Sequence, residues 1–402
     1  MQITHIDLQR VGDADEISAE IAGFRLWYRI TPCGVHAPSA DAFLAAALLP
    51  AMARGEPLEL AGATASPRLL RGLDQLQAVF ATWRSELRPV PVAAAEAPPV
   101  APRLGVVSFF SGGVDSLHTF LERQDEITHA VQIHGFEYRR QNRALAEEAE
   151  HANRRFVEGR QRQLVVVESN FREFYEGHRI HNHLYHGGVL ASIALTLGFA
   201  RAYVPASDTW EGLSPWGSHP VSDPLWGTES VEIVHHGADA RRVDKLRRLG
   251  REPDALELLR VCPTNTVYSC GSCEKCVRTR VLMRVLGIRS PRLPELGDLA
   301  PVRRLRVTDA ATRIVWQENL EAAVEAGDRA LAQAISLVIA RYDVRRAALS
   351  LERALFGGRL LRAKRALRRA LGRPVGQTPE LGPVRPDVEL PTATPPVAAK
   401  PS

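Results

Sequence analysis

A six-residue run at positions 111–116, Ser-Gly-Gly-Val-Asp-Ser, constrains the fold more than any other feature, because it separates a strand pattern from a helix pattern. Residues 104–110 are mostly apolar, β-branched or aromatic and have the length of a buried strand. Residues 117–121 place apolar side chains at helical spacing. Two glycines permit a tight turn, and the N–H groups at the start of the helix, with the hydroxyls of Ser111 and Ser116, can bind phosphate. The run therefore predicts a phosphate-binding loop; a plain strand-to-helix turn is the alternative.

Strand and helix patterns alternate after this loop. Apolar segments of strand length recur at 129–134, 163–168 and 202–206. Helix patterns are found at 115–123, 142–158 and 188–198. This alternation predicts an α/β fold with a doubly wound parallel sheet covered on both faces. Ligands of such sheets bind at the carboxyl ends of the strands near a topological switch point, which is where we expect the 111–116 loop.

The composition is that of a soluble globular protein: 402 residues, 45% hydrophobic and 24% charged, enough for two to three domains. No stretch approaches the roughly 20 apolar residues of a membrane-spanning helix, and no signal-peptide pattern is found. We therefore expect a cytoplasmic protein. Because 51 basic and 46 acidic side chains give a net charge of only +5, overall charge is no evidence for nucleic-acid binding.

Changes in composition divide the chain into five segments. We expect an N-terminal α+β module (1–87), a Pro- and Ala-rich linker (88–103), a nucleotide-binding domain (104–287), a helical C-terminal region (288–373) and a disordered tail (374–402). In the N-terminal module, the patterns predict strands at 24–30 and 58–60 and a helix at 41–49 that stops at Pro50. A second helix is expected to begin with Ser66 as its cap and Pro67 at its first position. In the C-terminal region, a helix is expected over 318–342.

Four of the five cysteines lie close together in the pattern Cys-x7-Cys-Gly-Ser-Cys-Glu-Lys-Cys, namely Cys262, Cys270, Cys273 and Cys276. Disulfides are rare in the cytoplasm, whereas four thiolates can surround Zn²⁺ tetrahedrally. Gly271 permits the tight backbone that the two-residue gaps require. The cluster therefore predicts a zinc site; a redox Cys-x-x-Cys pair and an iron–sulfur cluster are the alternatives. Cys33 stands alone and is interpreted as a small buried side chain.

The 111–116 run resembles the SGGxDS loop of the N-type ATP pyrophosphatase (PP-loop) superfamily, whose members bind ATP, transfer AMP to a substrate oxygen and release pyrophosphate. The Gly-Lys-Ser/Thr ending of a Walker loop is absent. With the cysteine cluster downstream, the chain resembles the 7-cyano-7-deazaguanine synthase (queuosine biosynthesis) branch over residues 104–287. That family activates a carboxylate with ATP, converts it through an amide to a nitrile with ammonia, and carries zinc.

The resemblance implies ATP, Mg²⁺ and Zn²⁺ as cofactors and assigns roles to several residues. The residues at the ATP phosphates would be Ser111, Gly112, Gly113, Asp115 and Ser116, with Asp115 acting through Mg²⁺ or backbone N–H groups. Lys245 lies roughly where the family carries a lysine facing the phosphates, so Asp115, Ser116 and Lys245 are the candidate catalytic residues. A solvated charge is the alternative for Lys245. His134 ends the second strand and is a candidate nucleotide contact, with a structural histidine as the alternative.

Residues 207–229 form an unusual loop with three tryptophans, where the family carries an Asp-Cys-Arg substrate signature that this chain lacks. A deazapurine substrate is therefore not implied. The candidate substrate residues are Asp208, Trp216, His219, Asp223, Trp226 and Glu229. The tryptophans would stack on a planar substrate, and the carboxylates would bind Mg²⁺ or an amine. An ordered loop without a chemical role is the alternative. His178, His181, His183 and His186 lie close together in the sequence but show no clear two-site helical pairing, so we interpret them as a partly exposed loop face. A metal or acid–base site is the alternative.

The leading hypothesis is an ATP-dependent adenylating enzyme that activates a small-molecule carboxylate, amide or carbonyl oxygen for attack by ammonia, another amine or another nucleophile. A second hypothesis is a nucleotide-binding sensor or interaction module without turnover. A third is a tRNA-modifying enzyme whose basic segment at 359–373 binds RNA or another anionic partner. The sequence favours no oligomeric state.

Overall fold

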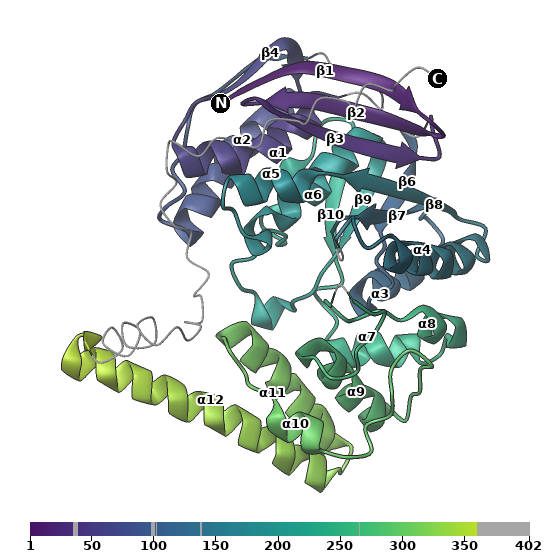
Figure 1. The fold of residues 1–402 in the computed structure, drawn as a ribbon, viewed down its shortest axis with the longest axis vertical. Coiled ribbons are helices and arrows are strands. Elements are labelled where there is room, and N and C mark those ends of the chain that lie inside the picture. The colour runs from purple at the N-terminus through teal and green to yellow at the C-terminus, as the bar shows by residue number, and fades with distance from the viewer. Residues whose placement is uncertain (35–38, 98–100, 102, 137–138, 265, 360–402) are drawn as a thin grey trace, which may run out of the picture. The chain divides into compact units, whose positions relative to one another are not determined.

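The computed structural model describes residues 1–34, 39–97, 101, 103–136, 139–264 and 266–359 (Figure 1). Within these ranges, residues 1–240 and 263–268 form one compact unit, and residues 241–262 and 269–359 form a second. This division differs from the expected segments, because the N-terminal module joins the first unit and the cysteine cluster belongs to the second. The basic segment from 360 to 373 and the expected tail lie outside the described residues. No helix in the described ranges is long and apolar enough to cross a membrane.

The first unit is built on a sheet of ten strands in the order β10-β9-β6-β7-β8-β3-β2-β1-β4-β5. The strands are β1 (Gln2–Val11), β2 (Ala14–Ile21), β3 (Phe24–Thr31), β4 (Leu58–Ala65), β5 (Val92–Glu96), β6 (Arg103–Phe109), β7 (His129–His134), β8 (Gln163–Ser169), β9 (Phe199–Pro205) and β10 (Glu232–His236). From β10 to β8 all pairs are parallel, β8-β3-β2-β1 are antiparallel, and β1-β4-β5 are parallel again. The α/β class and the four strands expected after residue 103 are confirmed.

Two short 3-10 helices and six α-helices belong to the same unit. They are α1 (Asp41–Arg54), α2 (Pro67–Trp83), α3 (Val114–Glu122), α4 (Arg143–Glu158), α5 (Phe171–Gly177), α6 (Asn182–Leu197), η1 (Trp210–Gly212) and η2 (Asp223–Trp226). Ser66 caps α2 as predicted, since its hydroxyl accepts a bond from the Leu69 N–H at 3.0 Å. The expected linker at 88–103 contains β5 and therefore contributes to the sheet.

The expected stop of α1 at Pro50 is wrong, because the helix continues to Arg54. Proline has no N–H, so the carbonyl of Ala46 loses its donor within the helix. The buried hydroxyl of Tyr175 on α5 donates to this carbonyl at 2.8 Å. A tertiary hydrogen bond thus replaces the missing helical one, and residues 51–54 stay helical. Sequence pattern alone contains no sign of this replacement.

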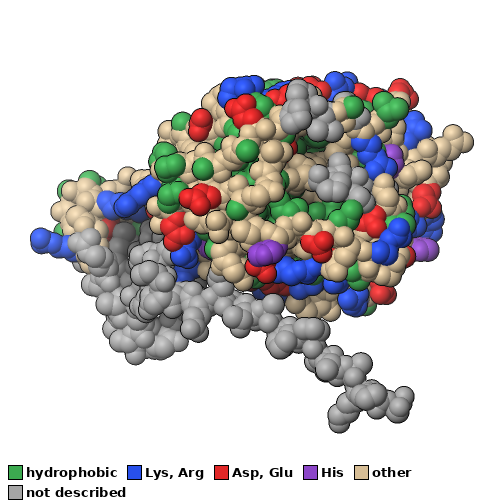
Figure 2. Space-filling view, turned by 90° about the horizontal axis from the view of Figure 1, so that it is seen from above, with side chains coloured by type: hydrophobic (Ala, Val, Ile, Leu, Met, Phe, Trp, Pro, Cys, Tyr) green, Lys and Arg blue, Asp and Glu red, His purple; other side chains and the backbone are tan. Residues whose placement is uncertain are grey.

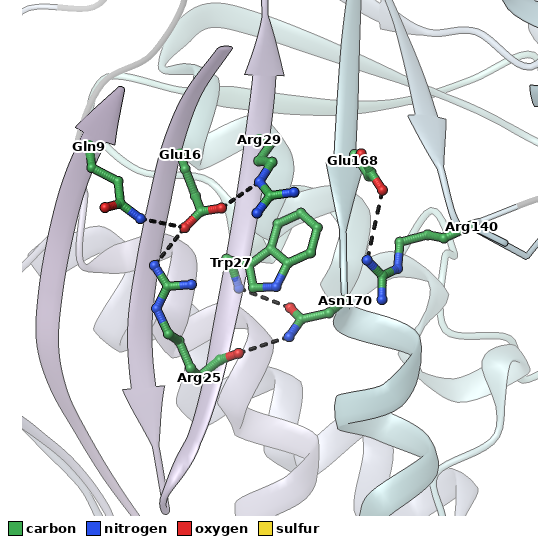
Figure 3. A network of polar contacts seen from close by, with 8 residues as sticks. All are labelled: Gln9, Glu16, Arg25, Trp27, Arg29, Arg140, Glu168 and Asn170. Carbon is green, nitrogen blue, oxygen red and sulfur yellow. Dashed lines mark hydrogen bonds and ion pairs between the residues drawn. The ribbon is translucent and has the colours of Figure 1, made fainter. Parts of the chain in front are cut away.

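The pairing of β3 with β8 joins the N-terminal strands to those that follow the phosphate-loop pattern, with Tyr28 opposite Ser169. Figure 3 shows the polar contacts at this junction. Asn170, just after β8, accepts a bond from the Trp27 N–H at 3.0 Å and donates to the Arg25 carbonyl at 2.8 Å. On the same face, Arg29 lies over the Trp27 ring at 4.3 Å from its centre. These bonds fix the register between the two halves of the sheet.

The second unit is helical in its described part. Its helices are α7 (Arg242–Leu249), α8 (Pro253–Leu258), α9 (Glu274–Leu286), α10 (Ala300–Arg304), α11 (Ala310–Glu325) and α12 (Arg329–Phe356). Apolar residues of α9 to α12 form its core around the buried Trp316. The single helix expected over 318–342 is instead divided between α11 and α12. Gly327 adopts a φ of 71° at the break, and Asp328 caps α12 by accepting a bond from the Leu331 N–H at 3.0 Å.

Candidate functional site

The loop at 111–116 lies between the buried end of β6 and the start of α3. Gly112 turns the chain with a φ of 74°, a conformation that favours glycine. The Ser116 hydroxyl donates to the Gly113 carbonyl at 3.1 Å and accepts from the Ser111 N–H at 3.2 Å. The Ser111 hydroxyl accepts from the Gly113 N–H at 3.3 Å. The serines therefore hold the loop closed over the first turn of a helix, where N–H groups and the helix dipole favour an anion.

The loop also lies where the chain changes direction across the sheet. From β6 the chain proceeds through β7 to β8 on one side, and then continues through β9 and β10 on the other. Because β6, β7, β9 and β10 are parallel, their carboxyl ends share one edge. The winding direction therefore switches between the paired strands β6 and β9, next to the loop, and open α/β sheets bind ligands at such a switch point.

Two carboxylates belong to segments at this switch point. Asp115 is in the first turn of α3, and Asp208 follows the end of β9. Burial, followed by the negative charge of Asp115, raises the pKa of Asp208, while a bond from the Ser214 hydroxyl at 3.0 Å opposes the shift. The two groups are therefore near enough to interact electrostatically. A cation between them would relieve their repulsion, and carboxylate oxygens are ligands that suit Mg²⁺.

The other predicted substrate residues are divided between structural and open positions. Trp226 has no exposed surface and lies 6.3 Å from the Phe80 ring centre, so it is part of the core. Glu229 accepts bonds from the Ser66 hydroxyl at 2.5 Å and the Arg68 N–H at 2.8 Å, and thereby holds the start of α2. These contacts do not support substrate roles for either residue. Trp216, by contrast, is 36% exposed.

Asp223 and His219 lie in a hydrogen-bonded group at the end of the same loop. Asp223 is 1% exposed and accepts bonds from the Ser218 hydroxyl at 2.8 Å, from His235 Nδ1 at 2.7 Å and from the His219 N–H at 3.2 Å. The His219 ring lies edge-on to Trp83 with centres 5.1 Å apart, and burial lowers its pKa. His235 was not among the residues predicted from the sequence. The sequence feature that could have indicated it is a histidine near the carboxyl end of a short strand, 12 residues after Asp223.

His134 ends β7, as expected, and its neighbours give it a structural role. Its Nε2 lies 3.2 Å from the amide of Gln132 and 3.4 Å from the carboxylate of Glu150. Burial is the main cause of its lowered pKa, which the negative charge of Glu150 partly offsets.

Lys245 lies on α7 of the second unit and is only 1% exposed. A solvated surface charge is therefore excluded for this residue. Ammonium groups are almost never this deeply buried unless a partner compensates the charge.

The four cysteines converge as predicted, and their sulfur atoms all lie within 4.8 Å of one another. The Cys262–Cys273 and Cys270–Cys276 pairs are both 3.9 Å apart, far longer than a disulfide bond. Tetrahedral zinc with Zn–S bonds of about 2.3 Å requires sulfur atoms about 3.8 Å apart. The spacing therefore fits a single ion; an iron–sulfur cluster would hold the sulfurs further apart, because its irons and sulfides lie between them.

The surroundings of the sulfurs suit thiolates bound to a cation. The Cys273 N–H donates to Cys270 Sγ at 3.3 Å, and the Cys276 N–H donates to Cys273 Sγ at 3.5 Å. Burial raises the pKa of the Cys273 thiol to about 11, so without a cation a thiolate here is unfavourable. Gly271 turns the loop with a φ of 69°, and Arg280 of α9 donates to its carbonyl at 2.7 Å.

Among the described residues, the cysteines are the group of His, Cys, Asp and Glu side chains close enough to share a metal ion. The histidine group does not converge in this way. His178 is buried against Phe174, with ring centres 4.9 Å apart. His183 and His186 lie 5.8 and 6.1 Å from the Trp216 ring centre. A metal role, the alternative for this group, is therefore not supported.

Comparisons of the chain with protein-family models, curated proteins and solved structures give no match. Functional inference therefore rests on the geometry of the two sites.

Proposed function

We propose that this protein is an ATP-dependent adenylating enzyme of the PP-loop type, which cleaves ATP to AMP and pyrophosphate and activates a carboxylate, amide or carbonyl oxygen. The observation that supports this proposal most is the position of the 111–116 loop. It lies between β6 and α3, at the point where the winding of the sheet switches from β6 to β9. When the strands are counted in chain order from β6, the order β8-β7-β6-β9-β10 is 3-2-1-4-5. This order supports a doubly wound fold with its ligand at the switch point.

In this proposal the loop binds the β- and γ-phosphates through backbone N–H groups and the hydroxyls of Ser111 and Ser116. Asp115 and Asp208 would hold Mg²⁺, which neutralises phosphate charge. The substrate oxygen attacks the α-phosphorus, its new P–O bond forms, and pyrophosphate leaves with the electrons of the broken P–O bond. The resulting adenylate carries AMP as a leaving group, which ammonia or another amine displaces.

The cysteine cluster is proposed to hold a structural Zn²⁺. Four thiolates leave no open coordination position for a substrate, so the ion would stabilise the fold and take no part in the reaction.

The proposal predicts that the purified full chain binds ATP with Mg²⁺, measured by titration calorimetry, and that Asp115→Ala weakens this binding at least tenfold. In a filtered extract of small metabolites, the wild type should release pyrophosphate and AMP in equal amounts. Asp125→Ala, an exposed aspartate three residues beyond α3, is the matched control and should behave as wild type. Absence of ATP binding by the wild type would refute the proposal.

A non-catalytic nucleotide sensor is the second candidate. Two of the residues expected to bind an acceptor, Trp226 and Glu229, make structural contacts instead, and this favours the sensor. Tight ATP binding that depends on Asp115, without pyrophosphate release in any metabolite fraction, would support the sensor over the enzyme.

A further inference from the structure

Asp223 and His235 form a pair whose geometry is that of a base and its orienting carboxylate. The Asp223 carboxylate is 1% exposed, and Oδ2 lies 2.7 Å from Nδ1 of His235. A second bond to Oδ2 comes from the Ser218 hydroxyl at 2.8 Å, and the His219 N–H donates to Oδ1 at 3.2 Å. Three donors surround the carboxylate, so it has little freedom to turn away from the imidazole.

This contact determines which ring nitrogen can accept a proton. A carboxylate accepts and does not donate, so the neutral His235 ring carries its proton on Nδ1 and its lone pair on Nε2. In the part of the chain that the structure describes, no side chain hydrogen-bonds to Nε2 of His235. The side chain keeps 5% of its surface exposed, which leaves Nε2 as the polar atom of this pair available to another molecule.

The pair lies at the same edge of the sheet as the phosphate-loop pattern. His235 is next to last in β10, opposite Val204 of the parallel strand β9. Asp208, which follows β9, interacts electrostatically with His235 and His219 and also with Asp115 of the loop. Asp208 therefore lies within electrostatic range of both the loop and His235.

Neighbouring His236 points to the other face of the sheet and has different partners. Its Nδ1 lies 3.2 Å from the hydroxyl of Thr119 on α3, and its Nε2 accepts a bond at 3.0 Å from Nε of Arg123, the residue that follows α3. His236 therefore has both ring nitrogens occupied. Of these two adjacent histidines, only His235 retains a nitrogen for chemistry.

The loop that carries Asp223 is fixed against α6. The Gly217 N–H donates to the His183 carbonyl at 2.6 Å, and a Cβ placed on Gly217 would lie 2.0 Å from the Leu184 carbonyl oxygen. A Cβ on Gly187 of α6 would likewise lie 2.1 Å from the Gly217 carbonyl oxygen. Such close backbone contact holds Ser218 and Asp223 in place before any ligand binds, as general-base catalysis requires.

We propose that His235, oriented by Asp223, is the general base of the second half of the reaction; this inference rests on the proposed adenylating function. Ammonia or an amine forms its N–C bond to the carbonyl carbon of the adenylated acceptor. The C–O bond to AMP breaks, and AMP leaves with its electron pair. The proton lost by the nitrogen passes to Nε2 of His235. Asp223 is a positioning residue that stabilises the imidazolium so formed.

The first test measures whether His235 faces the bound nucleotide. The probe is ATP with Mn²⁺ in place of Mg²⁺, added to the full chain labelled with ¹⁵N-histidine. The 13 histidines give few enough ring signals for His235→Gln to assign the one of interest. The His235 signal should broaden, whereas His129, at the opposite end of β7, should stay sharp. Binding of Mn²⁺–ATP that leaves His235 as sharp as His129 would overturn the inference while the proposed function stands.

The second test separates the two halves of the reaction in the metabolite fraction that supports pyrophosphate release. His235→Gln should release about one pyrophosphate per enzyme and then turn over about 100-fold more slowly, because the adenylate forms but is not consumed. His151→Gln, a change at an exposed histidine of α4, is the matched control. Steady turnover of His235→Gln at the wild-type rate would refute its role as the base.

Asp223→Asn provides a readout that a merely structural role would not change. The Asn oxygen can accept a hydrogen bond from Nδ1–H, but the Asn NH₂ group can instead donate to an unprotonated Nδ1. The ratio of the two His235 tautomers should therefore change in the ¹⁵N spectrum. Unchanged tautomer and turnover in a variant that melts like the wild type would exclude Asp223 as the positioning residue.

Discussion

At the scale of single residues, the clearest electrostatic feature is Glu16, a carboxylate on β2 that is 1% exposed. It accepts bonds from Arg25 and Arg29, each at 2.5 Å, and from Gln9 at 2.8 Å (Figure 3). Burial raises its pKa, but the bonds from Arg25, Gln9 and Arg29 together outweigh burial, so the pKa lies below 4.5. The charged form is therefore favoured in the folded protein.

We predict that Glu16→Gln lowers the free energy of unfolding by about 2 kcal/mol at pH 7, a moderate value because both arginines are partly exposed. Since the pKa is lowered on folding, the stabilisation is complete above the unfolded value of 4.5 and is lost as the pH falls through the folded value. Urea unfolding at pH 7 and pH 4 measures this. Glu20→Gln, at an exposed position of the same strand, is the control. A difference between wild type and Glu16→Gln that grows towards acid would contradict the assignment.

Residue-level reasoning from the sequence was most successful where the chemistry is local. The serines of the 111–116 loop, the Ser66 cap and the four cysteines are close in sequence to their partners, so spacing alone predicts their arrangement. Glu229 and His235 find partners 163 and 12 residues away, through chain pairings that no periodicity reveals. Side chains of opposite sign are also interspersed on the face that Figure 2 shows, so composition there indicates no single charged partner.

At the scale of elements, the contact between the 207–229 loop and α6 determines where Asp223 lies. We predict that Gly217→Ala lowers the melting temperature by about 5 °C, because the added methyl meets the Leu184 carbonyl oxygen, which cannot move without displacing α6. Turnover should fall with it, since Asp223 would shift from His235. Gly297→Ala, where nothing lies within 4 Å, should melt as the wild type. Equal melting temperatures of the two variants would show that the loop accommodates the added methyl group without loss of stability.

Strands with several buried apolar residues were predicted from the sequence, and strands that are mostly polar were missed. Strands β6 to β9 were predicted because each contains several apolar side chains that are buried in the parallel part of the sheet. β1 alternates exposed polar residues and was not predicted. The pairing of β3 with β8 involves residues about 140 apart in the chain, a distance over which sequence patterns give no register.

At the scale of the whole molecule, the boundary between the two units does not coincide with a change in composition, and the cysteines belong to the helical second unit. Cys273 caps α9 and Cys276 lies on it, and Val277 and Val281 of the same helix belong to the core around Trp316. Arg280 of the same helix also donates to the carbonyls of Gly271, Pro294 and Glu295. The sulfur cluster and this core therefore depend on one helix.

We predict one zinc ion per chain by elemental analysis and its loss in Cys273→Ser. Chelation of the metal should expose α7 to α9 to proteolysis while residues 1–240 stay protected. Without a cation, the four adjacent sulfurs repel one another as thiolates or take up protons, and the loop loses its constraint. The Cys33→Ser variant, which is changed outside the cluster, should keep its zinc and should resist proteolysis like the wild type. Iron with visible absorption in the wild type would assign an iron–sulfur centre instead. Unchanged proteolysis after complete zinc removal would mean that the helix α9 core holds the second unit together without the metal.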